Sequence, residues 1–408
     1  MGDVKKFKIG VVGVKRGDCF MKMFHNNLEE AEISAVCEND PSVAEEFKKW
    51  YPGIPVYADF DEFIESGLDA VALANFFHEH VGYAIKAMEK GIAVLSETTA
   101  APTLGGCVDL VETAERTGAK YMLAANCLYF PAVHAMKPLL EEKKYGKILY
   151  AEAEYVHGHD EGGMPTQKGV DYENLHWRQT VPGTYYNMHS LGPLMYITNS
   201  EPVKVSCKAT YDPEFCAERK YYFDSPAAQV ISEMDNGAIF NTTGCNETFP
   251  SNKWYRLAFE QGALETTKYA EAKDLIVAKG HCETLSTTRH SWVSSGVVEA
   301  DDYKEGTAEA AGHGGIDYFV GYYFVKYLQG KHEPFLDVYR SARLSANGIL
   351  AWYSVLSDGK EYPVPDFRKK EDRDKVRGDY RMPFAKRYED LTLPCRMDKK
   401  EEFTGCDL

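Results

Sequence analysis

Residues 8–17 read Lys-Ile-Gly-Val-Val-Gly-Val-Lys-Arg-Gly, and this stretch decides the fold of the first part of the chain. The apolar residues 7–12 predict a β-strand, which runs into a turn containing Gly13 and Gly17. A helix is expected next, and a second apolar strand over residues 33–37 ends at Glu38, 25 residues after Gly13. A strand, a glycine turn, a helix and a strand that ends in an acid are the opening of a dinucleotide-binding βαβ unit.

Each part of this opening has a physical role toward a dinucleotide. Gly13 allows the tight turn, and the free N–H groups at the start of the helix can bind a pyrophosphate. Glu38 lies near the place, about 20 residues on, of the acid that bonds the adenosine ribose. A carboxylate there repels a 2′-phosphate, which favours NAD over NADP. Lys15 stands where the motif usually has a glycine, and we include it with Arg16 and Gly17 among the cofactor-binding candidates.

The composition is that of a soluble globular protein. The 408 residues, 44% hydrophobic and 26% charged, suffice for two domains with ample cores. The formal net charge of −16 argues against a nucleic-acid partner and against an anionic membrane surface. We expect neither a signal peptide nor a membrane span. The 10 cysteines include no Cys-x-x-Cys pair, which favours reduced thiols and a cytoplasmic protein.

The hydrophobic pattern changes near residue 127. Before it, continuous apolar strands such as residues 70–74 and 92–96 alternate with helical segments. This alternation predicts a parallel sheet covered on both faces, in a doubly wound Rossmann domain over residues 1–127 that binds NAD. After it, longer alternating strands predict a large, mostly antiparallel sheet; they cover residues 148–156, 203–211, 227–234, 238–245 and 255–265.

The predicted fold class is therefore α/β, with a C-terminal α+β domain over residues 128–365 that binds the substrate. Within it, residues 268–311 are polar and are expected to form an irregular excursion. Residues 366–408 are dense in charge and are expected to be a solvated C-terminal extension. The outer face of a broad sheet needs cover, which favours a homo-oligomer.

Several motifs together resemble those of the Gfo/Idh/MocA oxidoreductases. They are the opening strand and turn, Ala-Val-Cys-Glu at residues 35–38, His80 eleven residues before Gly91, and Glu97 after a predicted strand. The resemblance covers roughly residues 7–365. It implies a two-domain, NAD(P)-dependent enzyme that acts on sugars or cyclitols.

A second set of motifs is similar to the NAD-dependent glycosidase branch, typified by α-N-acetylgalactosaminidases. The matching segments are Glu-Thr-Thr-Ala-Ala (97–101), Asn-Cys-Leu-Tyr (126–129), Tyr-Val-His (155–157), Tyr-Tyr-Asn-Met-His-Ser-Leu-Gly-Pro (185–193) and His-Gly-Gly-Ile-Asp (313–317). This resemblance implies a tightly bound NAD that is cycled within one turnover.

Two positions depart from these patterns. The dehydrogenases carry a catalytic Lys directly after the acid, where this chain has Thr98. The glycosidase branch tends to carry an acid just before the Asn, where this chain has Ala125. The first departure argues against oxidation by a lysine base, and the second favours a redox description over a glycosidase.

The resemblance also implies roles for polar residues that follow predicted strands. Ligands bind at the carboxyl ends of the strands in open α/β folds. We expect Glu97 near the nicotinamide ribose, Asn126 near the carboxamide, and Asn75 and His80 on the same rim. A surface histidine at a helix start is the alternative for His80.

Oxidation of a sugar hydroxyl by NAD+ needs a base within about 3 Å of the hydroxyl oxygen. Because Thr98 cannot serve, the catalytic candidates are Tyr155, His157, Tyr186 and His189. Tyr155 and His157 lie two apart on one predicted strand and share a face, and Tyr186 and His189 share one side of a helical turn. Aromatic packing is the alternative for the tyrosines, and a hydrogen-bonded strand histidine is the alternative for His157.

Substrate candidates come from two further segments. Trp177 could stack on a sugar ring and Arg178 could grip it, with His176 beside them; a structural aromatic–arginine contact is the alternative. His313 and Asp317 are four apart at a predicted helix start and share a face. The resemblance places both at the substrate, and a helix cap is the alternative for His313.

A metal site is a weaker interpretation of another cluster. His157, His159 and Asp160 carry ligand types that suit Zn or Mn. The two histidines lie two apart on a strand, and Asp160 is expected in the following turn. We therefore assign no metal.

The leading hypothesis is an NAD-dependent oxidoreductase that acts on a ring hydroxyl, at carbon 3, of a sugar or glycoside, with Tyr or His as base. One alternative is a glycosidase, in which the ketone acidifies the neighbouring C–H, a base expels the anomeric substituent, water adds and NADH reduces the ketone. Another is a non-catalytic sensor of sugar or NAD. The expected partner is a small carbohydrate or glycoside, with no nucleic acid and no membrane.

Overall fold

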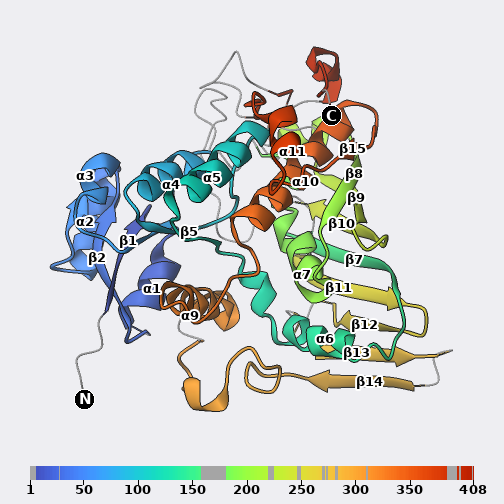
Figure 1. Ribbon diagram of the computed structural model, residues 1–408, viewed down its shortest axis with the longest axis horizontal. Helices are drawn as coiled ribbons and strands as arrows, with labels where there is room; N and C mark the ends of the chain where they lie inside the picture. Colours follow the sequence, from blue (N-terminus) through green and yellow to red (C-terminus); the bar gives the residue numbers. More distant parts are fainter. Residues whose placement is uncertain are drawn as a thin grey trace. The chain divides into compact units, whose positions relative to one another are not determined.

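A computed structural model of the chain divides into two compact units, which are described separately (Figure 1). The first unit comprises residues 1–101, 106–129 and 298–342, and the second comprises residues 102–105, 130–297 and 343–408. The structure describes residues 6–26, 28–157, 181–218, 225–245, 250–268, 272, 274–280, 284–308, 311–383, 393–394, 397–406 and 408. These units are defined by packing alone, so they do not test the domain boundaries that the sequence predicts.

The first unit contains the predicted doubly wound sheet. Its strands pair in the order β3-β2-β1-β4-β5-β6, and every pair is parallel. The strands are β1 (Phe7–Val12), β2 (Ala31–Cys37), β3 (Val56–Tyr57), β4 (Ala70–Leu73), β5 (Ala93–Ser96) and β6 (Tyr121–Leu123). All four residues of β4 and of β5 are buried, as strands covered on both faces must be.

Helices connect these strands and recur in the second part of the chain. They are α1 (Asp18–Asn26), α2 (Pro41–Trp50), α3 (Phe60–Ile64), α4 (His80–Glu89), α5 (Leu104–Thr117), α6 (Pro131–Glu141), α7 (Met188–Thr198), α8 (Pro213–Glu218), α9 (Ile316–Leu328), α10 (Val338–Leu356) and α11 (Lys370–Val376). The Asp40 carboxylate caps α2, accepting from the N–H groups of Ser42 and Val43, and Pro41 is its first residue. Helix α9 packs beside α1, where Phe324 meets Phe24 at a ring separation of 6.5 Å (Figure 1).

The second unit contains the predicted broad sheet, in the order β14-β13-β12-β11-β7-β10-β9-β8-β15. The strands are β7 (Ile148–Val156), β8 (Pro202–Ala209), β9 (Ala227–Met234), β10 (Ile239–Cys245), β11 (Asn252–Phe259), β12 (Gly262–Thr266), β13 (Asp274–Lys279), β14 (Thr284–Arg289) and β15 (Tyr362–Pro363). The pair β7–β10 is parallel and the other pairs are antiparallel. The mostly antiparallel sheet is thus confirmed.

Two expectations about the strands in the second half of the chain are wrong. The single strand predicted over residues 255–265 is the hairpin β11–β12, whose turn at Glu260 and Gln261 lacks the usual turn residues. The excursion predicted over residues 268–311 contains β13 and β14. Strand β14 lies at the sheet edge and is largely Ser and Thr, so its sequence shows no hydrophobic alternation.

The tail is not simply solvated. Phe367 is fully buried, Leu393 is 1% exposed, and the Trp352 indole N–H donates to the Pro394 carbonyl at 3.0 Å. The tail contains buried apolar residues, but they are too widely spaced in its charged sequence to form a hydrophobic pattern. Among the helices that the structure describes, none combines the length and the apolar character that a membrane crossing requires.

Candidate functional site

The turn after β1 has a backbone that only glycine can adopt. Gly13 has a φ of +80°, and a Cβ atom there would lie 2.7 Å from the Ala74 carbonyl oxygen. A Cβ atom at Gly17 would lie 2.6 Å from the Gly13 carbonyl oxygen. The Gly17 N–H donates to that same oxygen at 2.8 Å, and α1 begins at the next residue. The turn therefore brings bare backbone to the start of a helix, the arrangement that accepts a pyrophosphate.

Glu38 is held at the end of β2 by this turn. One carboxylate oxygen accepts from the Val14 N–H at 3.1 Å, and the other accepts from the Asp40 N–H at 3.0 Å. The carboxylate thus lies beside the glycine turn, where the acid of a dinucleotide site stands. Lys15, between the two glycines, is exposed.

The polar residues predicted at the carboxyl edge follow β4 and β5. His80 is only 2% exposed, so the alternative of a surface histidine is wrong. Its Nδ1 lies 3.1 Å from the Glu97 carbonyl oxygen and its Nε2 lies 3.2 Å from the Asn75 carbonyl oxygen. Burial lowers the pKa of His80, which favours the neutral ring. A neutral imidazole has one N–H, so it can donate to only one of these two carbonyl oxygens at a time. The Asn75 side-chain oxygen is buried and has no hydrogen-bond partner among the residues that the structure describes.

Arg16 and Glu97 form an ion pair at this edge. The charge of Glu97 raises the pKa of Arg16, and Asp317 contributes in the same direction. The second Glu97 oxygen accepts from the Thr98 N–H at 2.9 Å. Thr98 itself is 5% exposed, and it occupies the place of the family's lysine. The pair brings the glycine turn and the end of β5 together.

A third group at this edge joins Asn126, Asp317 and His313. The Asn126 amide donates to one Asp317 oxygen at 2.7 Å, and the other Asp317 oxygen lies 2.6 Å from Nδ1 of His313. Asn126 begins the 3-10 helix Asn126–Tyr129, and His313 begins the 3-10 helix His313–Gly315 that precedes α9. The predicted shared face of His313 and Asp317 is confirmed.

In the second unit, three of the four catalytic candidates form a stack. The Tyr155 and His189 rings are 4.4 Å apart and inclined by 29°. The Tyr186 ring lies 6.3 Å from Tyr155 and 6.1 Å from His189, nearly parallel to both. The ring of His157, the residue after β7, is 6.0 Å from Tyr155. The structure thus gathers residues from β7, from the 3-10 helix Gly183–Tyr186 and from α7.

Sequence reasoning missed the residues that hold this stack. Asn187, between Tyr186 and His189, is buried; its amide donates to Asn347 at 2.5 Å, and its oxygen accepts from Thr242 at 3.0 Å. The Tyr255 hydroxyl donates to the His189 carbonyl at 2.8 Å. The available signal for Asn187 was its place inside the motif at residues 185–193.

Some predicted residues lie outside the described part of the chain. They are His159, Asp160, His176, Trp177 and Arg178. Among the residues that the structure does describe, no three His, Cys, Asp or Glu side chains are grouped to hold a metal ion.

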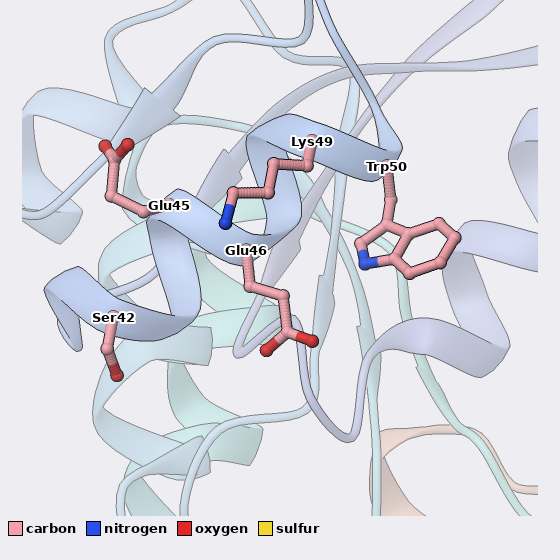
Figure 2. A pocket seen from close by; sticks show the side chains of 5 residues that line it. All are labelled: Ser42, Glu45, Glu46, Lys49 and Trp50. Atoms are coloured by element: carbon pink, nitrogen blue, oxygen red, sulfur yellow. The ribbon is translucent and has the colours of Figure 1, made fainter.

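The first unit also has a hollow on its surface. It is lined by Ser42, Glu45, Glu46, Lys49 and Trp50, all from α2 (Figure 2). These residues repeat at helical spacing along one face, and Trp50 is 75% exposed. Because a single helix supplies the whole lining, side chains from different elements do not meet there as they would in an active site.

The glycine turn, the acid after β2 and the polar strand ends define the first unit as the NAD-binding Rossmann domain of an oxidoreductase. The comparison with family models agrees. Residues 7–125 match the oxidoreductase family with NAD-binding Rossmann fold, Gfo/Idh/MocA, and residues 298–373 match the C-terminal domain of glycosyl hydrolase 109. The predicted resemblance to this oxidoreductase family and to its glycosidase branch is confirmed, and the chain is an NAD-dependent enzyme.

Individual relatives point the same way. A glycosyl hydrolase family 109 protein of Stenotrophomonas maltophilia is 25% identical over 74% of this chain and 73% of its own. An alpha-N-acetylgalactosaminidase of Tannerella forsythia is 24% identical over 73% of this chain and 70% of its own. Levoglucosan dehydrogenase in complex with NADH and levoglucosan has a similar fold, with a TM-score of 0.71 and 16% identity, over 88% of this chain and 100% of that one.

Proposed function

We propose that this enzyme oxidises a ring hydroxyl, at carbon 3, of a sugar or glycoside, with a Tyr/His group in place of a lysine base. The observation that carries the proposal is the stack of Tyr155 on His189, with ring centroids 4.4 Å apart. It occurs in a chain that has Thr98 at the place of the family's lysine. The similarity to a sugar dehydrogenase and to a named glycosidase supports a carbohydrate substrate.

The residues at the strand ends fit the cofactor. The cradle at Gly13 and Gly17 would be filled by any Cβ atom, and the unpartnered Asn75 oxygen can accept a hydrogen bond from a ligand. Glu38 would hold the adenosine ribose, with Lys15, Arg16, Asn75, His80, Glu97 and Asn126 as further cofactor residues. Bound there, NAD supplies a hydride acceptor that can later return the hydride.

The chain's own residues would handle the proton. A phenol titrates near pH 10 and an imidazole near pH 6.5, so an imidazole is the group that can accept a proton at neutral pH. We assign that role to His189, with Tyr155, Tyr186 and His157 completing the group. The residues His176, Trp177, Arg178, His313 and Asp317 are assigned to the substrate.

A glycosidase outcome is the second candidate. It is favoured by the match of residues 298–373 to the glycosyl hydrolase 109 C-terminal domain. In that outcome the ketone acidifies the neighbouring C–H, the anomeric substituent leaves, water adds and the ketone is reduced. We further propose a cytoplasmic homo-oligomer that binds neither nucleic acid nor membrane.

The test begins with the purified protein. Bound nucleotide is released by acid and identified by mass spectrometry, and levoglucosan or para-nitrophenyl N-acetyl-α-galactosaminide is then added. Fluorescence of NADH reports oxidation, and nitrophenol colour reports glycoside cleavage. Tyr155→Phe and His189→Gln should each lower the rate of NADH formation by about 100-fold or more. Bound NAD with neither signal, across a panel of glycosides and free sugars, would instead identify a sensor.

A further inference from the structure

We propose that His313 is a second acid–base group of this enzyme, with Asp317 and Asn126 as its positioning residues. This inference rests on the proposed function and deepens it. His313 would take the proton from carbon 2, next to the ketone, and return it to the departing anomeric oxygen. It would therefore serve the cleavage of a glycoside and not its oxidation.

The hydrogen bonds fix the orientation of the imidazole. Nδ1 of His313 lies 2.6 Å from an Asp317 oxygen, so Nδ1 donates and Nε2 is left as the basic nitrogen. Asp317 is 4% exposed, whereas the His313 side chain is 38% exposed. The carboxylate is buried behind the ring and the ring reaches solvent. This is the geometry in which a carboxylate orients a histidine and compensates the charge that the ring gains.

The carboxylate is itself held in place. The Asn126 amide donates to the second Asp317 oxygen at 2.7 Å, and Asn126 is 8% exposed. Asn126 lies 191 positions before Asp317, so two distant segments combine to orient one carboxylate. Asn126 was assigned above to the nicotinamide carboxamide, and one N–H of its amide is already engaged by Asp317.

The backbone at His313 is unusual. Four consecutive residues have positive φ angles, namely Gly312 at 114°, His313 at 44°, Gly314 at 66° and Gly315 at 105°. A positive φ is disfavoured for a residue with a Cβ atom, and such conformations concentrate at functional sites. A Cβ atom at Gly312 would lie 3.0 Å from an Asp317 oxygen, so the glycine allows the backbone to approach the carboxylate. A residue that only caps a helix requires neither this run of positive φ angles nor the close approach of the backbone to a carboxylate.

The group lies at the carboxyl edge of the parallel sheet. Asp317 is near enough to Arg16 for its charge to raise the Arg16 pKa, and Arg16 is paired with Glu97. Segments after β1, β5 and β6 and the start of α9 therefore converge on one place within the first unit. In an open α/β sheet this edge is where ligands bind.

The chemistry of cleavage needs such a group. Oxidation of carbon 3 to a ketone, with two electrons passed to NAD+, uses one proton acceptor. Elimination then breaks the C2–H bond, and its electron pair forms the C1=C2 bond. The C1–O bond breaks with its electrons on oxygen, and that oxygen needs a proton. The C2 proton, carried by His313, supplies it; water then adds OH to carbon 1 and H to carbon 2, and the two electrons return to carbon 3.

The experiment compares three readouts in the full-length enzyme with its bound NAD. The probe is para-nitrophenyl N-acetyl-α-galactosaminide, and the readouts are NADH fluorescence, nitrophenol release and exchange of the carbon-2 hydrogen in D₂O by NMR. In His313→Gln, exchange and release should fall by about 100-fold or more relative to NADH formation. Asp317→Asn should lower the same ratio, and His25→Gln, at an exposed histidine of the same unit, should leave it unchanged.

A readout without turnover checks the positioning. In ¹⁵N-histidine-labelled protein freed of nucleotide, the Nδ1 proton of His313 should give a low-field resonance because of its short bond to Asp317. Both variants should lose it, and His25→Gln should keep it. If His313→Gln does not fold, as judged by circular dichroism, Asp317→Asn carries the comparison.

The outcomes separate this inference from the proposed function. Wild-type protein that forms NADH without exchanging the carbon-2 hydrogen overturns the inference and leaves the oxidation standing. Equal losses in all three readouts indicate a structural role for His313 and also overturn it. Wild-type protein that gives none of the three signals, with this probe and across the panel of glycosides and free sugars, overturns the proposed function as well.

Discussion

Glu38 accepts hydrogen bonds from the N–H groups of Val14 and Asp40, which places its carboxylate beside the glycine turn. Glu38→Ala should weaken NAD binding by about tenfold, because a hydrogen bond to a charged group contributes about 1.5–3 kcal/mol and 1.4 kcal/mol is a factor of ten. Binding of NADP should weaken less, because the repulsion of its 2′-phosphate disappears. Titration of intrinsic fluorescence with both nucleotides measures the ratio of affinities. Glu29→Ala, at an exposed glutamate of the same unit, is the control, and an unchanged ratio in Glu38→Ala would exclude the ribose contact.

His80 makes stability depend on pH. Burial lowers the pKa of His80 in the folded protein, whereas the unfolded chain has the ordinary value near 6.5. The folded state therefore binds fewer protons below about pH 6.5. Its contribution to the free energy of unfolding is complete above that pH and is lost as the pH falls, by at most about 1.4 kcal/mol per pH unit.

Urea unfolding on both sides of this pH measures the effect. His80→Gln should be less stable than the wild type at neutral pH, because the buried hydrogen bond is weakened, but its stability should fall less steeply on acidification. His25→Gln, at an exposed position, should keep the wild-type slope. Parallel slopes for the wild type and His80→Gln would show that His80 does not carry the effect.

At the residue scale, sequence reasoning found side chains but not their partners. The spacing of four correctly predicted that His313 and Asp317 meet, although residues 312–315 have positive φ angles and the contact is not that of a regular helix. The Asn126–Asp317 bond was not predicted, since 191 positions separate the two and only the fold brings them together. The burial of His80 depends likewise on the packing of two strand ends.

At the element scale, two glycines let other elements approach the 3-10 helix that carries Tyr186. A Cβ atom at Gly348 in α10 would lie 2.6 Å from the Thr184 carbonyl oxygen, and one at Gly244 in β10 would lie 2.6 Å from the Gly183 carbonyl oxygen. Gly348→Ala should lower stability by about 1–3 kcal/mol, because backbone must shift to admit the methyl group. Thermal unfolding by calorimetry measures the loss.

A matched control uses a glycine of the same unit in open space. A Cβ atom at Gly378 would meet nothing within 4 Å, so Gly378→Ala should change the unfolding temperature little. A Gly348→Ala protein as stable as Gly378→Ala would show that the helix yields easily. The 3-10 helix would then not hold Tyr186 rigidly against Tyr155 and His189.

Elements of the first unit were predictable because hydrophobicity alone defines them. The strand predicted over residues 7–12 matches β1 in both bounds. The elements of the second unit were harder to predict from the sequence, because one face of its sheet is open and its strands carry polar residues. Strand β14 pairs along one edge and carries Thr and Ser, so its partner β13, and not its own pattern, makes it a strand.

For the whole molecule, the outer face of the broad sheet leads to the predicted homo-oligomer. Ile239 is 42% exposed and pairs with Tyr150, which is 40% exposed; on the next strand Ile231 is 37% exposed. Ile239 and Asn241 share a face, and Asn241 pairs with Ile231, so these apolar side chains gather on one surface of β7, β10 and β9. Asn241 and Glu233 lie among these three side chains on the same face. The proposed homo-oligomer would cover the exposed apolar residues.

Ile239→Glu places a charge on this face and should convert the proposed oligomer to a monomer. Burying an unpaired carboxylate in an interface costs several kcal/mol, which opposes association. Sedimentation at micromolar concentration measures the mass, and nucleotide binding shows that the fold is intact. Val293→Glu, at a residue that is 38% exposed but lies outside the sheet, should remain an oligomer. A wild-type chain that sediments as a monomer would refute the assembly, and an Ile239→Glu oligomer would move the interface to another surface.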